Sequence, residues 1–469
     1  MGELLVLLNK AIWAGTACTA ALLLTACDNG KMAQICAPET ATAALRPAAA
    51  ETTGPITAYW DGSESIAGYI DGANANLHPL ADVHRLINDH ARDGSSEIVW
   101  KRFGEKIAPL PAPSDPTAVS FYRCGDRADC DNQESRLDDV LNQIADDRTP
   151  GLRVIVSDLW LSTSAFKGST EVAIGGPLRR ILSGANGKEP RSIGVIGVRA
   201  PYSGPVYEVP NVGTHRGARE RPLFVVLVGT RKEILAAYRT LTRASSPAFA
   251  ENRINFTWFG PEPAADWMGD IPEARLTGSA IPAPVLSAPE TPIRQIEISV
   301  KDLQAGTSGM TVAVNPKARV LPGAIWEGEP NGYARVWRRK GNGCGAGAWE
   351  ALPDLQGSWR VNTDDAGNQN ATFVLDRRAA ADLLPGHTYL INASFTTRTV
   401  KSNSEAARWM RDWSVSPEQA SAVSARNPAF FPALNLAELA SILERSTQDQ
   451  QPEGGRPLAT LALIVKTKS

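Results

Sequence analysis

Residues 56–65 read ITAYWDGSES, an apolar run that passes directly into a turn rich in oxygen-bearing side chains. The run Ile56–Trp60 has the length and composition of a buried strand. A second run, Arg153–Ser157, is equally apolar at its centre and is followed by Asp158. The strongest strand signal in the chain is Leu223–Gly229, which reads LFVVLVG. Buried strands separated by long segments predict a sheet whose strands are joined by helices.

Helical periodicity occurs in the segments between these strands. Apolar residues recur at helical spacing in residues 77–91 and 136–145, and further helical segments begin at Pro177 and Lys232. Strands that alternate with helices predict an α/β fold for residues 55–260, with a mostly parallel sheet and helices on both faces. Ligands of such sheets bind at the carboxyl ends of the strands.

Oxygen donors gather at two of these strand ends. Asp61, Ser63 and Ser65 follow the first strand as Asp-x-Ser-x-Ser, and Asp158 follows a later one. Hydroxyl and carboxylate oxygens are hard donors that suit Mg²⁺, Mn²⁺ or Ca²⁺ better than zinc. The pattern predicts a site for Mg²⁺ or Mn²⁺, with Ca²⁺ as a third option. A purely structural interpretation stays open, because DGS is a common turn and Asp61 then caps the loop.

The strand, the DGSES turn, the helix and the later strand ending in Ser-Asp resemble a von Willebrand factor A-type domain with a metal-ion-dependent adhesion site. The resemblance covers residues 55–260, under half of the chain. It implies that Ser63 and Ser65 contact the metal and that Asp61 and Asp158 hold it directly or through water. The family also has members whose site is degenerate and which act only as scaffolds.

One motif departs from the family pattern. The family supplies a Thr from a loop before its middle helix, whereas the loop before Leu137 reads DNQES here. Asp131 and Ser135 are the residues of this loop that could stand in for the Thr. At this position the resemblance to the family's metal site is incomplete.

The N-terminal segment has the pattern of an export signal. An apolar run at 11–26 ends in Leu-Thr-Ala-Cys, which resembles the bacterial lipobox. The resemblance implies that residues 1–26 are a signal peptide, that Cys27 carries lipid and that residues 27–54 form a flexible tether. It also implies a bacterial lipoprotein on an envelope membrane, facing the periplasm, with inner or outer membrane left open. An ordinary transmembrane anchor is the alternative.

Two of the cysteines lie close together in a polar loop. Cys124 and Cys130 belong to the segment RCGDRADCD, and the envelope is an oxidising compartment, so we expect a disulfide between them. A zinc site is the competing interpretation, although no CxxC motif or paired His supports it. The state of Cys36 and Cys344 stays open.

The pattern changes after the α/β region. Residues 261–294 are rich in proline and predict a semi-rigid linker. Residues 295–469 mostly alternate with period two and predict a β-rich second domain with added helices at 405–412 and 436–445. The segment Leu384–Tyr389 resembles the turn into a strand of immunoglobulin-like sandwiches, so such a sandwich is one interpretation of this domain.

Charge and motif content together suggest a function. The 469-residue chain has a formal net charge of -2, which excludes a polybasic nucleic-acid binder. We expect a non-enzymatic envelope lipoprotein that binds a protein partner, with the metal bridging to an acidic side chain on that partner. A metal-dependent hydrolase of phosphate or sulfate esters, with Ser63 as nucleophile, is one alternative. A structural scaffold with a degenerate metal site is the other.

Overall fold

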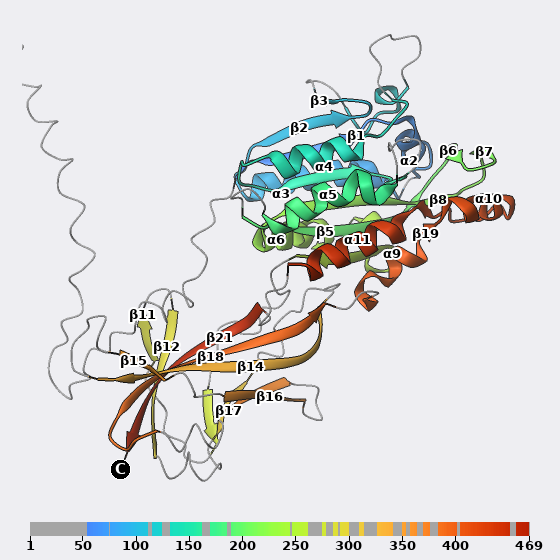
Figure 1. Ribbon diagram of the computed structural model, residues 1–469. Helices are drawn as coiled ribbons and strands as arrows, with labels where there is room; N and C mark the ends of the chain where they lie inside the picture. The colour runs from blue at the N-terminus through green and yellow to red at the C-terminus, as the bar shows by residue number, and fades with distance from the viewer. Residues whose placement is uncertain are drawn as a thin grey trace, which may run out of the picture.

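The computed structural model of the chain contains an α/β part and a β-rich part (Figure 1). In the α/β part it describes residues 54–74, 76–110, 115–123, 132–161, 169–184, 189–243, 246–260 and 404–450. In the β-rich part it describes residues 274–277, 285–288, 291–299, 309–313, 326–340, 349–352, 357–363, 369–375, 383–400 and 456–468. The predictions about residues 1–26, the tether up to residue 53, Cys27, Cys36, Cys124, Cys130, Asp131 and Cys344 lie outside these described residues.

A seven-stranded sheet forms the centre of the α/β part. Its strands lie in the order β3-β2-β1-β4-β8-β5-β9. Their bounds are β3 Ile107–Pro109, β2 Ile98–Phe103, β1 Ile56–Asp61, β4 Arg153–Ser157, β8 Glu220–Gly229, β5 Ser192–Pro201 and β9 Ile254–Phe259. The strands expected from the apolar runs at Ile56, Arg153 and Leu223 therefore lie side by side at the middle of the sheet.

The sheet is mixed, which corrects the expectation of a mostly parallel one. Only β1 pairs in parallel, with β2 on one side and β4 on the other. The remaining neighbours, β2–β3, β4–β8, β8–β5 and β5–β9, are antiparallel. The physical reason lies in the connection between β5 and β8. It is the short hairpin of β6 (Val206–Val209) and β7 (Gly213–His215), and without a crossover helix the chain returns in the opposite direction.

Helices cover both faces of the sheet, as expected. One core cluster joins the sheet to α2 (Ala67–Asp71), α3 (Pro79–Asp93) and α6 (Arg231–Arg243). The other joins it to α4 (Leu137–Asp146) and α5 (Thr170–Ser183). Alternation along β1 separates the two clusters, because Trp60 belongs to the first and Tyr59 to the second. Residues Val119–Phe121 form a short 3-10 helix, η2.

The C-terminal helices belong to the α/β part, which corrects the expected domain boundary. Residues 404–450 form α9 (Arg408–Asp412), α10 (Pro417–Ala425) and α11 (Leu436–Gln448). Buried residues of α11 lie in the same core cluster as those of α4 and α5, and Figure 1 shows α11 beside α5 on one face of the sheet. Most of the β-rich part therefore lies between β9 and residue 404, and its last strand follows the C-terminal helices.

The β-rich part contains two sheets. One has the order β10-β13-β17-β16 and the other β11-β12-β21-β18-β14-β15. Their strands are β10 (Ala274–Thr277), β11 (Val285–Ala288), β12 (Thr291–Ser299), β13 (Gly309–Ala313), β14 (Trp326–Arg339), β15 (Trp349–Leu352), β16 (Gly357–Thr363), β17 (Gln369–Leu375), β18 (Thr388–Val400) and β21 (Arg456–Lys468). The last strand, β21, pairs with β12 in parallel and with β18 antiparallel.

The segment expected to be a proline-rich linker contributes to these sheets. Within 261–294 the structure has β10, β11 and the start of β12. Both β10 and β11 are edge strands and neither contains a proline, whereas Pro292 lies on β12. Among the described residues, no helix has the length and apolar character needed to cross a membrane.

Candidate functional site

The turn after β1 is organised by the carboxylate of Asp61. Asp61 is fully buried, and its Oδ1 accepts a hydrogen bond from the backbone N–H of Ser63 at 2.9 Å. Its Oδ2 accepts from the hydroxyls of Ser135 at 2.8 Å and Ser157 at 2.7 Å. Three donors from three segments thus converge on one side chain, which fixes the loops at this edge of the sheet relative to one another.

Burial changes the acidity of Asp61. Removal from water and, after it, the charge of the neighbouring Asp158 together raise the pKa of this carboxyl from its usual 3.8 to about 6. The hydrogen bonds from Ser157 and Ser63 oppose the rise because they stabilise the charged form. The charged form of the buried Asp61 carboxylate is therefore unfavourable in the folded protein, and the side chain has a structural role.

A chain of polar contacts leads from the turn to the end of β4. The hydroxyls of Ser63 and Ser65 lie 3.1 Å apart. Ser65 Oγ donates to Asp158 Oδ2 at 2.9 Å. Asp158 is buried, with 2% of its surface exposed. The four residues expected to form one site, Asp61, Ser63, Ser65 and Asp158, are thus brought together.

The loop before α4 is attached to the same turn. The backbone N–H of Glu64 donates to the carbonyl of Asn132 at 3.0 Å, and the side-chain amide of Asn132 donates to the carbonyl of Tyr122 at 2.8 Å. This pairing places Ser135 against Asp61, so Ser135 does lie where a stand-in for the family's Thr was expected. Its hydroxyl, however, is used by Asp61.

The residue that the sequence analysis missed is Arg221. Its Nη1 lies 3.3 Å from Asp158 Oδ2, and the side chains of the two are only 1% and 2% exposed. The guanidinium lies 5.3 Å from the ring centre of Trp160 and 4.9 Å from that of Tyr202. Burial lowers the pKa of Arg221, but Tyr69, Asp158 and Tyr202 raise it more, and the net direction is upward. Arg221 is a permanent cation inside the site.

Strand direction explains why Arg221 lies there. β8 is antiparallel to β4, with Phe224 opposite Ser157, so the amino end of β8 meets the carboxyl end of β4. Under the expected parallel arrangement, the opposite end of β8 would have lain beside Asp158. The signal available in the sequence was Arg221 itself, which precedes the apolar run Leu223–Gly229 by two positions and lies within β8.

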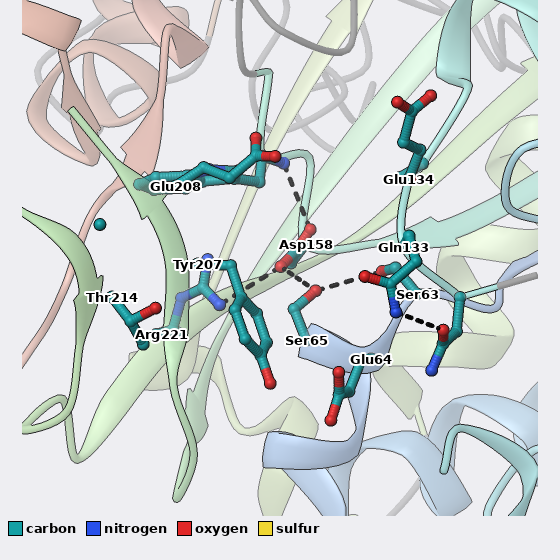
Figure 2. Close-up of a pocket in the computed structure, with 14 residues that line it drawn as sticks. Ser63, Glu64, Ser65, Gln133, Glu134, Asp158, Tyr207, Glu208, Thr214 and Arg221 are labelled. Atoms are coloured by element: carbon teal, nitrogen blue, oxygen red, sulfur yellow. Dashed lines mark hydrogen bonds and ion pairs between the residues drawn. The ribbon is translucent and has the colours of Figure 1, made fainter. Parts of the chain in front are cut away.

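These residues form the wall of a cavity of about 350 Å³, shown in Figure 2. The dashed contacts in that view run from Arg221 to Asp158, then to Ser65 and Ser63. The β6–β7 hairpin forms the opposite wall. The lining residues are Ser63, Glu64, Ser65, Asn132, Gln133, Glu134, Ser135, Asp158, Trp160, Tyr207, Glu208, Gly213, Thr214 and Arg221.

The spacing of the oxygen donors resembles that of a metal site, but their charge does not fit one. Adjacent ligands of an octahedral Mg²⁺ lie about 3 Å apart, close to the spacing of Ser63, Ser65 and Asp158. The carboxylates are nevertheless already used. Asp61 accepts three hydrogen bonds, and Asp158 is paired with Arg221. A divalent ion here would lie next to a buried guanidinium, so the donor set does not fit the expected Mg²⁺, Mn²⁺ or Ca²⁺.

The described lining of the cavity holds carboxylates but no His, Lys or Cys. The hydroxyl of Ser63, the proposed nucleophile of the hydrolase alternative, contacts the hydroxyl of Ser65 and the carboxylate of Asp61, whose charged form burial disfavours. What this arrangement can do chemically is bind polar and charged groups.

Comparison with known proteins adds no relative. No family model, curated protein or solved structure matches the chain.

Proposed function

We propose that this chain is a non-enzymatic envelope lipoprotein that binds a protein partner at the strand-end cavity of its α/β part. The observation that carries the proposal is the composition of the cavity. It has hydroxyl, amide, carboxylate and aromatic groups on opposing walls, and no His, Lys or Cys in the described lining. Such a surface supplies hydrogen bonds and charge for recognition. The LTAC segment before residue 28 supports the envelope location and the lipid on Cys27.

The charge of the cavity favours a basic group on the partner. Its described lining has four acidic side chains, Glu64, Glu134, Glu208 and Asp158, against the single basic Arg221. The expectation of an acidic ligand residue depended on a metal that presents positive charge to the partner. Because Arg221 is already paired with Asp158, the remaining carboxylates make a Lys or Arg of the partner the better complement.

The relation to the von Willebrand A-type family remains part of the proposal. The DGSES turn and the Ser-Asp strand end meet at one edge of the sheet, which supports it. The antiparallel β8 between β4 and β5 is a departure from the arrangement expected here. The immunoglobulin-like character of the β-rich part likewise remains a prediction, which the pairing of its two sheets does not decide.

Site-specific photocrosslinking in intact cells tests the binding face. A photoreactive residue at Thr214, on the cavity wall, should give a discrete protein adduct. The same residue at Val172, which is 72% exposed on α5 outside the cavity, should not give that adduct. Glu134→Lys should abolish the Thr214 adduct by charge reversal. The control Glu97→Lys, at an exposed position before the amino end of β2, should leave it intact.

Two results would count against the proposed function. One is an absence of any adduct from Thr214 under conditions in which the protein is folded and exported. The other is a Thr214 adduct that survives Glu134→Lys unchanged, since this would remove the role of cavity charge. Turnover of a phosphate or sulfate ester by the purified protein would favour the hydrolase alternative instead.

A further inference from the structure

We infer that Arg221 takes the place of a divalent metal in this site, so that the strand-end face is held together by the protein's own guanidinium and is independent of metal. The inference concerns the same face as the proposed function, but it is tested on the purified protein alone. A failure of the proposed partner binding can therefore be distinguished from a failure of the role assigned to Arg221.

The positive charge of Arg221 lies next to the buried negative charge of Asp158. Two carboxylates, Asp61 and Asp158, are buried within the same cluster of hydroxyls. Arg221 is the cation paired with this cluster, at 3.3 Å from Asp158 Oδ2. A buried carboxylate requires a partner of opposite charge, because the interior solvates it poorly. With Arg221 in place, Asp158 has that partner without an added ion.

The surroundings of Arg221 fix it in this position. The ring of Trp160 lies 5.3 Å from its guanidinium, and the ring of Tyr202 lies 4.9 Å from it. Tyr202 is itself held, because its backbone N–H donates to the carbonyl of Arg219 at 2.8 Å. A side chain enclosed in this way cannot swing out to admit a metal without exposing two aromatic rings. The positive charge is therefore part of the folded core.

The spacing of the hydroxyl and carboxylate oxygens matches that of ligands around a divalent metal. Ser63, Ser65 and Asp158 keep oxygen–oxygen distances of 3.1 and 2.9 Å, which match the edge of a metal octahedron. Removal of the guanidinium would leave these donors around an uncompensated Asp158. Such a variant should bind the divalent ion that the wild-type protein does not need.

The test compares melting temperatures in EDTA and in Mg²⁺, Mn²⁺ or Ca²⁺, using the full-length protein. Wild type should melt at the same temperature in all of them. Arg221→Met, which keeps an unbranched apolar side chain between the two rings, should melt lower in EDTA and rise by about 5 °C in saturating metal. Adding Asp158→Asn to Arg221→Met should abolish that rise.

The matched control is Arg199→Ala. Arg199 forms an ion pair with Glu220 but its side chain is 45% exposed, so its loss should create no response to metal. A metal-dependent rise in the wild-type protein would overturn the inference, as would a folded Arg221→Met variant that ignores metal. If Arg221→Met does not fold in EDTA, the yield of refolded protein in EDTA is compared with the yield in metal instead. Recovery in Mg²⁺ or Mn²⁺ supports the inference, and no recovery overturns it.

Discussion

The hydroxyl of Thr257 donates to the carbonyl oxygen of Ala406 at 2.6 Å, and Trp409 Nε1 donates back to the same hydroxyl at 2.7 Å. Thr257 lies on β9, at the edge of the seven-stranded sheet, and Ala406 begins the helical segment that completes the core. The chain thus leaves the α/β part and re-enters it at neighbouring points. All strands of the β-rich part except β21 lie between these two points of the chain.

Excision of the β-rich part is the first prediction. Replacing residues 261–403 by a short Gly/Ser linker and ending the chain after residue 450, which also removes β21, should leave a folded α/β part, because the two ends already lie side by side. Residues 54–260 alone should fail to fold cooperatively, since they lack the α11 residues of the core. Circular dichroism and urea denaturation measure both. A cooperative, stable 54–260 fragment would contradict this account of the domain boundary.

Asp61 gives a prediction about pH. Its folded-state pKa of about 6 lies above the unfolded value of 3.8, so the folded protein holds this proton more tightly. The contribution of Asp61 to the free energy of unfolding is therefore fully present below about pH 4 and falls between about pH 4 and 6. Asp61→Asn should remove this fall, which is at most about 1.4 kcal/mol per pH unit.

Urea denaturation of wild type and Asp61→Asn across this pH range makes the comparison. The difference in unfolding free energy between the two proteins should change only between about pH 4 and 6, and should be flat above it. A difference that is independent of pH throughout would show that burial and Asp158 do not perturb Asp61.

The ion pair of Arg153 and Asp147 supports a stability prediction remote from the cavity. Arg153 is fully buried on β4, with Nη2 at 2.6 Å and Nε at 2.9 Å from Asp147 Oδ2. Arg153→Met should lower the free energy of unfolding by about 3 kcal/mol, because Asp147 and nearby carbonyls lose their donor. Arg199→Ala, which breaks a more exposed ion pair, should cost about 1 kcal/mol or less. Equal costs would contradict the role assigned to burial.

Local sequence patterns predicted the parts of the fold that depend on neighbouring residues. The apolar runs located β1 and β4, and the acidic and hydroxyl residues after them located the turn of Asp61 and the position of Asp158. These follow from period and composition alone. Strand direction does not, because an apolar strand has the same pattern in either direction. The antiparallel β8, and with it Arg221, was therefore missed.

The C-terminal helices were placed in the wrong part for a related reason. Their amphipathic pattern shows that one face is buried, but it does not show against which partner. Leu439 and Leu443 of α11 lie in the core cluster of α4 and α5, far away in the sequence. The strands β10 and β11 were missed because prolines dominate the composition of 261–294, although neither four-residue strand contains one.

A Mn²⁺ titration followed by electron paramagnetic resonance tests the central claim most directly, because the signal of free Mn²⁺ falls as the ion binds. Full-length wild-type protein should leave the free signal unchanged at millimolar Mn²⁺, and Arg221→Met should remove one equivalent. That pair of results would assign the cation of this site to Arg221. The account would be contradicted if wild type bound one equivalent of Mn²⁺ and Ser63→Ala lost that binding. The site would then be a metal site, as the sequence predicted.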